Sequence, residues 1–228
     1  MRRVTLVAVF LVALAAPAWA DFQAGWDAIE RGDYATALRD WRPLAEQGDA
    51  AAQGNLGVMY GIGQGVPQDY AEAVRWYRLA AEQNNAVAQS SLGAMYDNGL
   101  GVPQDYAETV RWLRKAAEQD YAPAQSNLGA MYRDGEGVPQ DYAEAVKWFR
   151  KAAEQGEAMA QYSLGLRYND GKGVPQDYVR AHMWWNLASA RGLEYAKTNR
   201  DIVADKMTPA DIAEAQRLAR EWLAAHTQ

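Results

Sequence analysis

The chain has 228 residues, of which 49% are hydrophobic and 23% are charged, and its formal net charge is −6. This composition is typical of a folded protein, and the negative charge disfavours nucleic acids and anionic membranes as partners. The sequence contains no cysteine, which excludes disulfide bonds, a thiolate nucleophile and any cysteine-ligated metal.

Residues 1–20 have the features of a secretory signal peptide. Two arginines precede an apolar run over Val4–Ala16, and the small-residue pattern Ala18-Trp19-Ala20 follows it. The apolar run is too short to span a bilayer, so we expect cleavage after Ala20, with an uncleaved anchor as the alternative. Without both arginines the formal charge falls from −6 to −8. We therefore expect an exported protein, periplasmic or secreted, with no transmembrane segment in the mature chain.

Residues 21–49 are predicted to form an N-terminal capping pair of helices. The first of them covers about Phe22–Arg31. Gly32-Asp33-Tyr34 then starts a unit that half matches the repeat found further along the chain. Pro43 lies inside the second helix, where a proline is expected to kink or split it.

A 36-residue repeat dominates the rest of the sequence. The pentapeptide Val-Pro-Gln-Asp-Tyr begins at Val66, Val102, Val138 and Val174. Leu-Gly recurs in step at Leu56, Leu92, Leu128 and Leu164. Repeats of this period are typical of helical solenoids. We therefore predict an all-α fold, an α-solenoid superhelix of antiparallel helix pairs, with units at residues 50–85, 86–121, 122–157 and 158–192.

Each unit is predicted to contain two helices joined by a glycine-rich connector. In the second unit they cover about residues 86–98 and 106–119. The glycines of the connector can end a helix in the left-handed conformation, and Pro103 cannot continue one. Asp105 is an expected N-cap, and Glu108 three residues later completes the pattern of a capping box. In the fourth unit Arg180 replaces this glutamate.

Two invariant columns are expected to be structural. The first helices share a glycine column, which predicts close approach of the partner helix: Gly57, Gly93, Gly129 and Gly165. The second helices share a tryptophan column, which we interpret as core and not as a ligand site: Trp76, Trp112, Trp148 and Trp184.

Residues 193–228 are predicted to form C-terminal capping helices. Thr208-Pro209-Ala210-Asp211 combines an N-cap, a proline at the first helical position and an acid, which together indicate a helix start. The helix then runs to about Ala225, with apolar residues three and four apart. Stacked repeats need such atypical ends because a terminal unit has only one neighbour.

The repeat resembles the Sel-1-like repeat family, relatives of the tetratricopeptide repeats. The resemblance rests on stretches such as Ala122–Tyr132, Gly135–Tyr142 and Ala145–Trp148, and it covers about residues 50–192 well and 22–49 loosely. It implies a right-handed superhelix that serves as an adaptor or scaffold in protein complexes. A cysteine-rich branch has been linked to β-lactam binding, but this chain lacks those cysteines.

The variable columns of the first helices predict a binding face. They differ from unit to unit and share one side of the helix, roughly opposite the invariant side. First helices line the concave side in related solenoids, so we predict a groove for a protein or peptide partner. The predicted binding residues are Asn55, Ile62, Ser90, Ser91, Asp97, Asn98, Ser126, Asn127, Arg133, Asp134, Tyr162, Ser163, Asn169 and Asp170.

The outward face of the second helices is predicted to serve solubility and local ion pairs. In the first unit these charged residues are Glu72, Arg75, Arg78 and Glu82, and each has an identical or similar counterpart in the next two units. A charged face that repeats in this way is suited to pairs three and four residues apart on one helix.

No catalytic, cofactor or metal site is predicted. The glycine-rich connectors join helices and follow no strand, and the two histidines, His182 and His226, are far apart in sequence. The alternative functions are an envelope enzyme or an enzyme regulator acting on cell-wall polymer, a protein that binds that polymer or a β-lactam, and a secreted effector. Aromatic side chains gathered in the groove would favour a glycan, and a polar groove of mixed charge would favour a protein.

Overall fold

The computed structural model describes residues 18–226, with side chains described from Phe22 onward. The predicted signal peptide, apart from its last three residues, lies outside this range. The described part is all helix and confirms the predicted fold class. The helices are α1 (Ala18–Glu30), α2 (Tyr34–Glu46), α3 (Ala50–Ile62), α4 (Tyr70–Glu82), α5 (Ala86–Asn98), α6 (Tyr106–Ala117), α7 (Ala122–Asp134), α8 (Tyr142–Glu154), α9 (Ala158–Asp170), α10 (Tyr178–Ala190), α11 (Glu194–Ala204) and α12 (Pro209–His226).

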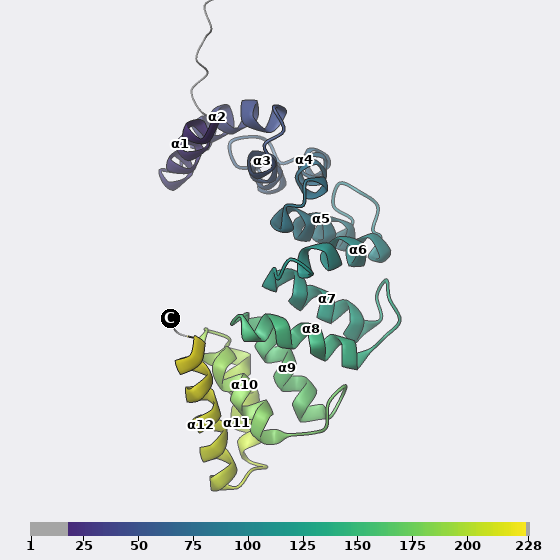
Figure 1. The fold of residues 1–228 in the computed structure, drawn as a ribbon, viewed down its shortest axis with the longest axis vertical. Coiled ribbons are helices and arrows are strands. Elements are labelled where there is room, and N and C mark those ends of the chain that lie inside the picture. The colour runs from purple at the N-terminus through teal and green to yellow at the C-terminus, as the bar shows by residue number, and fades with distance from the viewer. Residues whose placement is uncertain (1–17, 227–228) are drawn as a thin grey trace, which may run out of the picture.

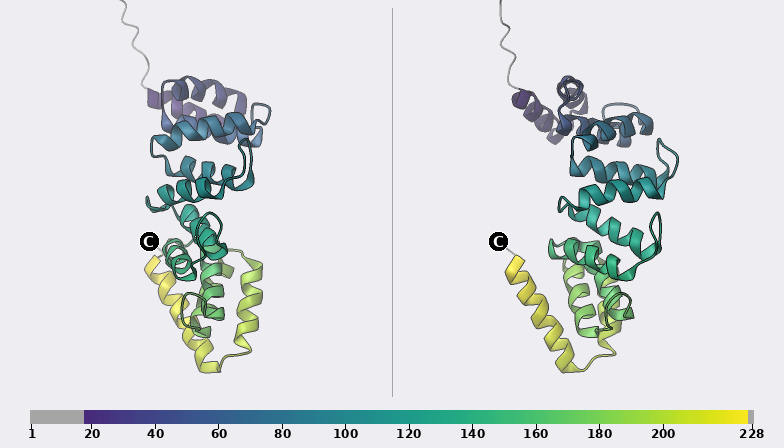
Figure 2. Two further views of the ribbon diagram at one scale, coloured as in Figure 1. Left: turned by 90° about the vertical axis from the view of Figure 1, so that its right-hand side faces the viewer. Right: turned by 45° about the vertical axis from the view of Figure 1, so that its right-hand side comes forward.

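The helices stack in chain order into an open arc (Figure 1). From α2 to α10, each helix packs against the one before it and the one after it, so the array behaves as a one-dimensional stack. The first helices α3 and α5 lie toward the open side of the arc, and α4 and α6 lie toward its outside (Figure 1). Two turned views show the same ladder of helix pairs from α1 down to α12 (Figure 2).

Aspartates begin the second helix of every unit, as predicted. Asp105 accepts hydrogen bonds from the backbone N–H groups of Ala107 and Glu108 at 2.9 and 3.0 Å. The reciprocal half of the predicted capping box is not formed. The N–H of Asp105 instead donates to the carbonyl of Tyr96, which ties the connector to the first helix of the unit. The Glu108 carboxylate is therefore free to bind Arg111 and Trp112.

The connector glycines hold two different positions. Gly99 ends α5 with a φ of 65°, in the left-handed conformation that side chains disfavour. Gly101, with a φ of 71°, lies against the preceding unit, where a Cβ would stand 2.3 Å from the carbonyl oxygen of Tyr70. The connector thus packs directly on the start of α4, and glycine is the residue that permits this approach.

The glycine column of the first helices confirms the predicted close approach. A Cβ on Gly57 would stand 2.5 Å from the ring of Tyr77, and one on Gly165 would stand 2.5 Å from the indole of Trp185. Gly93 faces the smaller Leu113, and the corresponding distance is 3.1 Å. The helix stability that each glycine costs is offset by the packing of a large side chain in the space it leaves.

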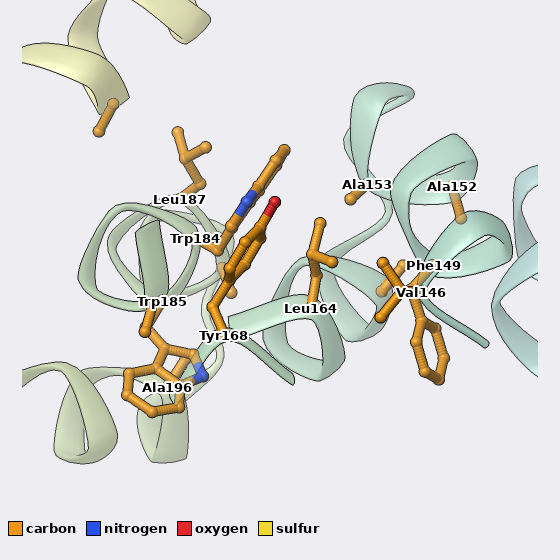
Figure 3. Packing of buried hydrophobic residues seen from close by; sticks show 14 of the residues in the cluster. Val146, Phe149, Ala152, Ala153, Leu164, Tyr168, Trp184, Trp185, Leu187 and Ala196 are labelled. Atoms are coloured by element: carbon orange, nitrogen blue, oxygen red, sulfur yellow. The ribbon is translucent and has the colours of Figure 1, made fainter. Parts of the chain in front are cut away.

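The core divides into layers that each join neighbouring units. One layer combines the inward faces of α4 and α5 and is closed by Trp112 from α6. The layer before it combines α2 and α3 and is closed by Trp76. Trp184 belongs to the large last layer (Figure 3), while Trp148 is only half-buried. Three of the four tryptophans are therefore core, as predicted, and Trp148 packs against its layer from a half-buried position. Each ring joins its own helix pair to the preceding second helix.

A column of buried glutamines links the layers. The Gln89 amide donates to the carbonyl of Ala81 in the preceding unit at 3.0 Å. Its oxygen accepts from Gln119, at the end of the second helix of its own unit, at 2.7 Å. The same two bonds are made by Gln53 with Ala45 and Gln83, and by Gln125 with Ala117 and Gln155. Buried amides need such partners, which explains why this column does not vary within the chain.

Part of the outward charged face has a structural role that the sequence analysis missed. Glu72 and Arg75 form the predicted local ion pair, and Glu108 and Arg111 form its equivalent. Arg78, however, donates to the hydroxyl of Tyr96 in the next unit at 2.8 Å. Equivalent bonds join Arg42 to Tyr60, Arg114 to Tyr132 and Arg150 to Tyr168. This arginine column therefore connects successive units.

The ends of the array are modified units. α1 and α2 pack like a regular pair, with Trp41 against Gly25, and Pro43 lies within one unbroken helix. α11 begins one period after α9 and repeats its buried alanine as Ala196. α12 packs on α10 through buried Ala219 and half-buried Trp222. No helix within residues 18–226 is both long and apolar enough to cross a membrane.

Candidate binding groove

The variable residues of the first helices were predicted to line the concave side of the solenoid. α3 and α5 contact each other directly, and they lie on the open side in Figure 1. The structure gives the fourteen predicted residues three kinds of environment. The exposed ones are Ile62, Asn98, Asn127, Asp134 and Asp170. The half-buried ones are Asn55, Ser91, Asp97, Arg133, Tyr162 and Asn169. The buried ones are Ser90, Ser126 and Ser163.

The three buried serines do not have the exposure that was predicted for them. Ser90 and Ser126 are 8% exposed and Ser163 is 6% exposed. Helical periodicity places their columns near the variable side, but neighbouring helices cover the side chains. Ser91 is also partly engaged, because it hydrogen bonds the hydroxyl of Tyr77. We leave these four serines out of the groove.

The charged predicted residues form short local pairs. Arg133 donates to both carboxylate oxygens of Asp134, at 2.7 and 2.5 Å. The guanidinium holds the pKa of Asp134 below its ordinary value. Asn169 donates to Asp170 at 2.7 Å, and the buried Arg167 lies 3.8 Å from the same carboxylate. The charges at this end of the groove therefore largely satisfy one another.

Tyr162 faces the C-terminal cap. Its ring meets Tyr195 of α11 edge-on at 4.6 Å between centroids, and its hydroxyl accepts from Asn199 at 3.1 Å. Tyr195 in turn places its hydroxyl 2.6 Å from the sulfur of Met159. These contacts join α9 to α11 and extend the groove by one more first helix.

The apolar residues of the groove were missed. Nine large hydrophobic side chains in the described part of the chain are prominently exposed, and seven of them lie on first helices or their equivalents in the caps. We call these seven the inner stripe: Trp26, Val58, Ile62, Val87, Met159, Tyr195 and Ile202. They fall at the second, ninth and thirteenth positions of their helices, which share one face at helical spacing. The sequence signal was present in the columns of Ala51 and Val58, which vary in size but stay largely apolar.

A hollow of about 340 Å³ interrupts the inner stripe between α5 and α7. Its apolar surface comes from Ala94 and Ala130, with Leu113 of α6 beneath them. The two alanines occupy the helix position held by Val58 and Leu166 in the first and fourth units, so the middle units leave more space. The charged residues around the hollow are all acidic, namely Asp97, Asp134 and Glu136, and we call it the acidic hollow. Four predicted residues meet here: Asp97, Asn98, Asn127 and Asp134.

Asp97 is an acid of this hollow that has no ion-pair partner among the described residues. Its half-buried carboxylate makes no hydrogen bond or ion pair with the described residues, whereas Asp134 is held by Arg133. Burial raises the pKa of Asp97, and no basic side chain in the described range lowers it in return. Asp97 thus carries an uncompensated desolvation cost that a bound cation would relieve.

The outward surface carries hollows of a different kind. One of about 380 Å³ lies on α6 beside Arg111, Arg114 and Lys115, and an equivalent one of about 300 Å³ lies on α4. Here the cations already have partners. Arg111 pairs with Glu108, Arg114 binds Tyr132, and Lys115 lies over the ring of Trp112. The cations of the hollow on α6 are therefore already engaged within α6 or by the next unit.

Nothing in residues 18–226 assembles a metal site. No group of three or more histidine, aspartate or glutamate side chains is arranged there to hold an ion. His182 is buried in α10, and His226 stacks on Trp222 at the end of α12.

Comparison with known proteins agrees with the repeat architecture. The Sel1 repeat matches residues 50–85, 86–121, 122–157 and 158–193. A Sel1 repeat protein from Oxalobacter formigenes is similar in structure, with a TM-score of 0.74 at 37% identity over 78% of this chain and 73% of its own. No curated protein matches the sequence.

Two further structures resemble the chain. A protective antigen of uropathogenic Escherichia coli with an SLR fold has a TM-score of 0.79 and 34% identity over 90% of this chain. The match spans only 46% of the antigen, so this chain corresponds to less than half of it. An immunity protein of Pseudomonas aeruginosa has a TM-score of 0.53 at 22% identity, covering 96% of this chain and 84% of its own, and shares the fold alone.

Proposed function

Because the chain belongs to the Sel1 repeat family, we propose that it is a non-catalytic adaptor of the bacterial envelope that holds a segment of another protein on its inner face. Sel1 repeat proteins generally act as protein-interaction scaffolds. The envelope location rests on the signal peptide predicted at residues 1–20, and the site rests on the groove.

The observation that carries the proposal is the inner stripe. Large exposed apolar side chains on a folded protein mark interaction surfaces when they lie together instead of singly. Here seven of nine lie on one side of successive first helices. Val87 is 52% exposed and Met159 is 45% exposed, whereas Leu79 is the one large hydrophobic side chain of a second helix that is prominently exposed in the described part of the chain, at 37%.

The composition of the groove favours protein over glycan. Sugar binding would call for a continuous run of exposed aromatic rings along the groove. Here Trp26 lies toward one end of the inner stripe and Tyr195, edge-on to Tyr162, lies toward the other, and the exposed large side chains between them are not aromatic. Polar and charged groups lie beside the aliphatic ones, around the acidic hollow and at Asp170. Such a mixture suits a peptide, whose side chains vary along its length.

The test is affinity capture of the chain from Asp21 onward out of envelope extracts, with mass spectrometry of the bound proteins. The groove variant combines Val87→Ser with Met159→Ser. Its matched control is Leu79→Ser, which removes a 37%-exposed apolar side chain from the outer surface. All three sites are exposed, so their effects on stability are small.

We expect proteins that bind the wild type and the control but not the groove variant. Equal capture by all three would contradict the proposal and direct attention to cell-wall polymer. Reversing the charges of Arg133 and Asp134 together is a weaker test, because the pair that they form would persist with its signs exchanged.

A further inference from the structure

The inner face changes from apolar to acidic and back to apolar along its length, and this order limits which ligands can cover all of it. Trp26, Val58, Ile62 and Val87 precede the acidic hollow, and Met159, Tyr195 and Ile202 follow it. Apolar surface thus lies on both sides of a centre whose charged side chains are acidic. A ligand complementary to the whole face needs a cation between two apolar stretches.

The acidic hollow is shaped for the side chain of a lysine or arginine. Both have apolar stems that pack on apolar surface and a charged end that seeks an acid. Ala94, Ala130 and Leu113 supply the apolar surface, and Asp97 supplies a carboxylate that no described cation occupies. The nearby Arg133 is committed to Asp134 at 2.5 Å and leaves Asp97 unneutralised.

From this arrangement we infer that the occupant is a linear segment of another protein with a lysine or arginine flanked on both sides by apolar side chains. The cation enters the acidic hollow and pairs with Asp97, and the flanking side chains cover the inner stripe. The inference rests on the proposed function and specifies its partner class. A free metal ion or polyamine would leave the apolar stretches uncovered.

The experiment selects 12-residue peptides from a random phage-displayed library on the chain from Asp21 onward. The strongest binder is then synthesised with a fluorescent label, together with a version in which norleucine replaces its basic residue. Binding is followed by fluorescence anisotropy. The variants are Asp97→Asn, which removes the charge, and Ala130→Leu, which fills the hollow with a side chain that Leu166 already carries at the same position.

Glu118→Gln is the matched control, because it makes the same change of acid to amide on the outer surface of the unit that holds Asp97. Thermal melting followed by circular dichroism checks that every variant is folded. We expect selected peptides to carry a basic residue between apolar ones. We expect Asp97→Asn and the norleucine peptide each to weaken binding about tenfold, and Glu118→Gln to change it less than about twofold.

The outcomes separate the inference from the proposed function. Peptides without a basic residue, or binding indifferent to Asp97→Asn but weakened by Val87→Ser, would overturn the cation site and leave the groove in place. No enrichment, or binding indifferent to every inner-face variant, would overturn both. Self-association in analytical ultracentrifugation that Val87→Ser abolishes would make the occupant a second copy of this chain and also overturn the inference.

Discussion

The fourth repeat has the same fold as the second and third, but it differs from them in how its buried polar groups are hydrogen bonded. In the second and third, Gln89 and Gln125 each bond at both ends of the amide. In the fourth, Gln161 Oε1, Arg167 Nε and His182 Nδ1 have no hydrogen-bond partner among the described residues. An unpaired buried polar atom costs about 1–3 kcal/mol.

The difference follows from what each repeat packs against. A middle repeat meets a near-copy of itself on either side, so one set of contacts serves both. The fourth repeat meets α11 and α12, whose sequences differ, and three column residues have changed with them. Arg191 replaces a glutamine, His182 replaces a valine and Arg167 replaces a methionine. The last layer is held by aromatic contacts instead, such as Trp184 against Trp222 at 6.2 Å.

The largest expected effect comes from the tryptophan column. Trp112→Ala should lower the free energy of unfolding by about 3–5 kcal/mol, because it opens a cavity in the layer that joins the first unit to the second. Trp184→Ala should cost a similar amount but loosen only the end of the array. Hydrogen exchange separates the two. Faster exchange confined to α8–α12 is expected for Trp184→Ala, and equal spread in both variants would contradict the layered account.

The glycine column offers a sharper comparison between repeats. Gly165→Ala should destabilise the protein by about 1–3 kcal/mol, because the new Cβ would stand 2.5 Å from the indole of Trp185. Gly93→Ala meets Leu113 at 3.1 Å, and the better helix propensity of alanine offsets the crowding by about 1 kcal/mol. Urea unfolding should therefore show a clear loss for Gly165→Ala alone. Equal losses would show that the ring shifts as easily as the leucine.

His182→Val restores the residue of the other three repeats and should stabilise the chain by about 1–2 kcal/mol at neutral pH, because it removes a buried unpaired nitrogen. Burial, and next Arg200, hold the pKa of His182 below its ordinary value of 6.5, and Asp201 opposes them.

Below about pH 6.5, His182 binds a proton more readily in the unfolded chain than in the folded one. The free energy of unfolding is therefore highest above that pH and falls as the pH drops toward the pKa of His182 in the folded chain. Melting temperatures from pH 7.5 to 5 should fall less in His182→Val than in the wild type. Parallel curves would exclude His182 as the source of the slope.

The smallest expected effect comes from restoring a hydrogen bond that the fourth repeat lacks. Arg191 stands where Gln83, Gln119 and Gln155 reach back to the glutamine column in the other repeats. Arg191→Gln should supply the missing donor to Gln161 Oε1 and raise stability by about 1 kcal/mol. A double-mutant cycle with Gln161→Leu measures the coupling. If Arg191→Gln still raises stability when Gln161 has been replaced, the increase comes from removing the guanidinium beside Gly156 and not from a new hydrogen bond.

The fold could be predicted from the sequence because the chain contains four copies of the same helix pair. The 36-residue period, the aspartate N-caps and the glycine and tryptophan columns all recur, and each has one physical explanation. The second helix of the second unit ends at Ala117, close to the predicted Gln119. The capping box failed because a single N–H can make one strong bond, and the backbone of Asp105 gives its own to Tyr96.

The groove was harder to predict because periodicity defines a side of a helix but not which of its edges the neighbours cover. Ser90 and Ser91 are adjacent in sequence, yet one is buried and the other half-buried against Tyr77. The prediction concentrated on variable polar residues and therefore missed Val87 and Met159, which are recognised as binding residues only once their exposure is known. Arg78 was assigned to solvent because its partner, Tyr96, lies 18 residues away in the next unit.

The glutamine column also makes the array extendable. Its bonds span 8 and 30 residues, and the arginine–tyrosine bonds span 18, so each one starts in a unit and ends in the same unit or an adjacent one. A duplicate of residues 86–121 inserted in register would therefore arrive with all of its internal partners and satisfy both neighbours. Gene duplication could lengthen the groove by one first helix at a time without any compensating substitution in the existing repeats.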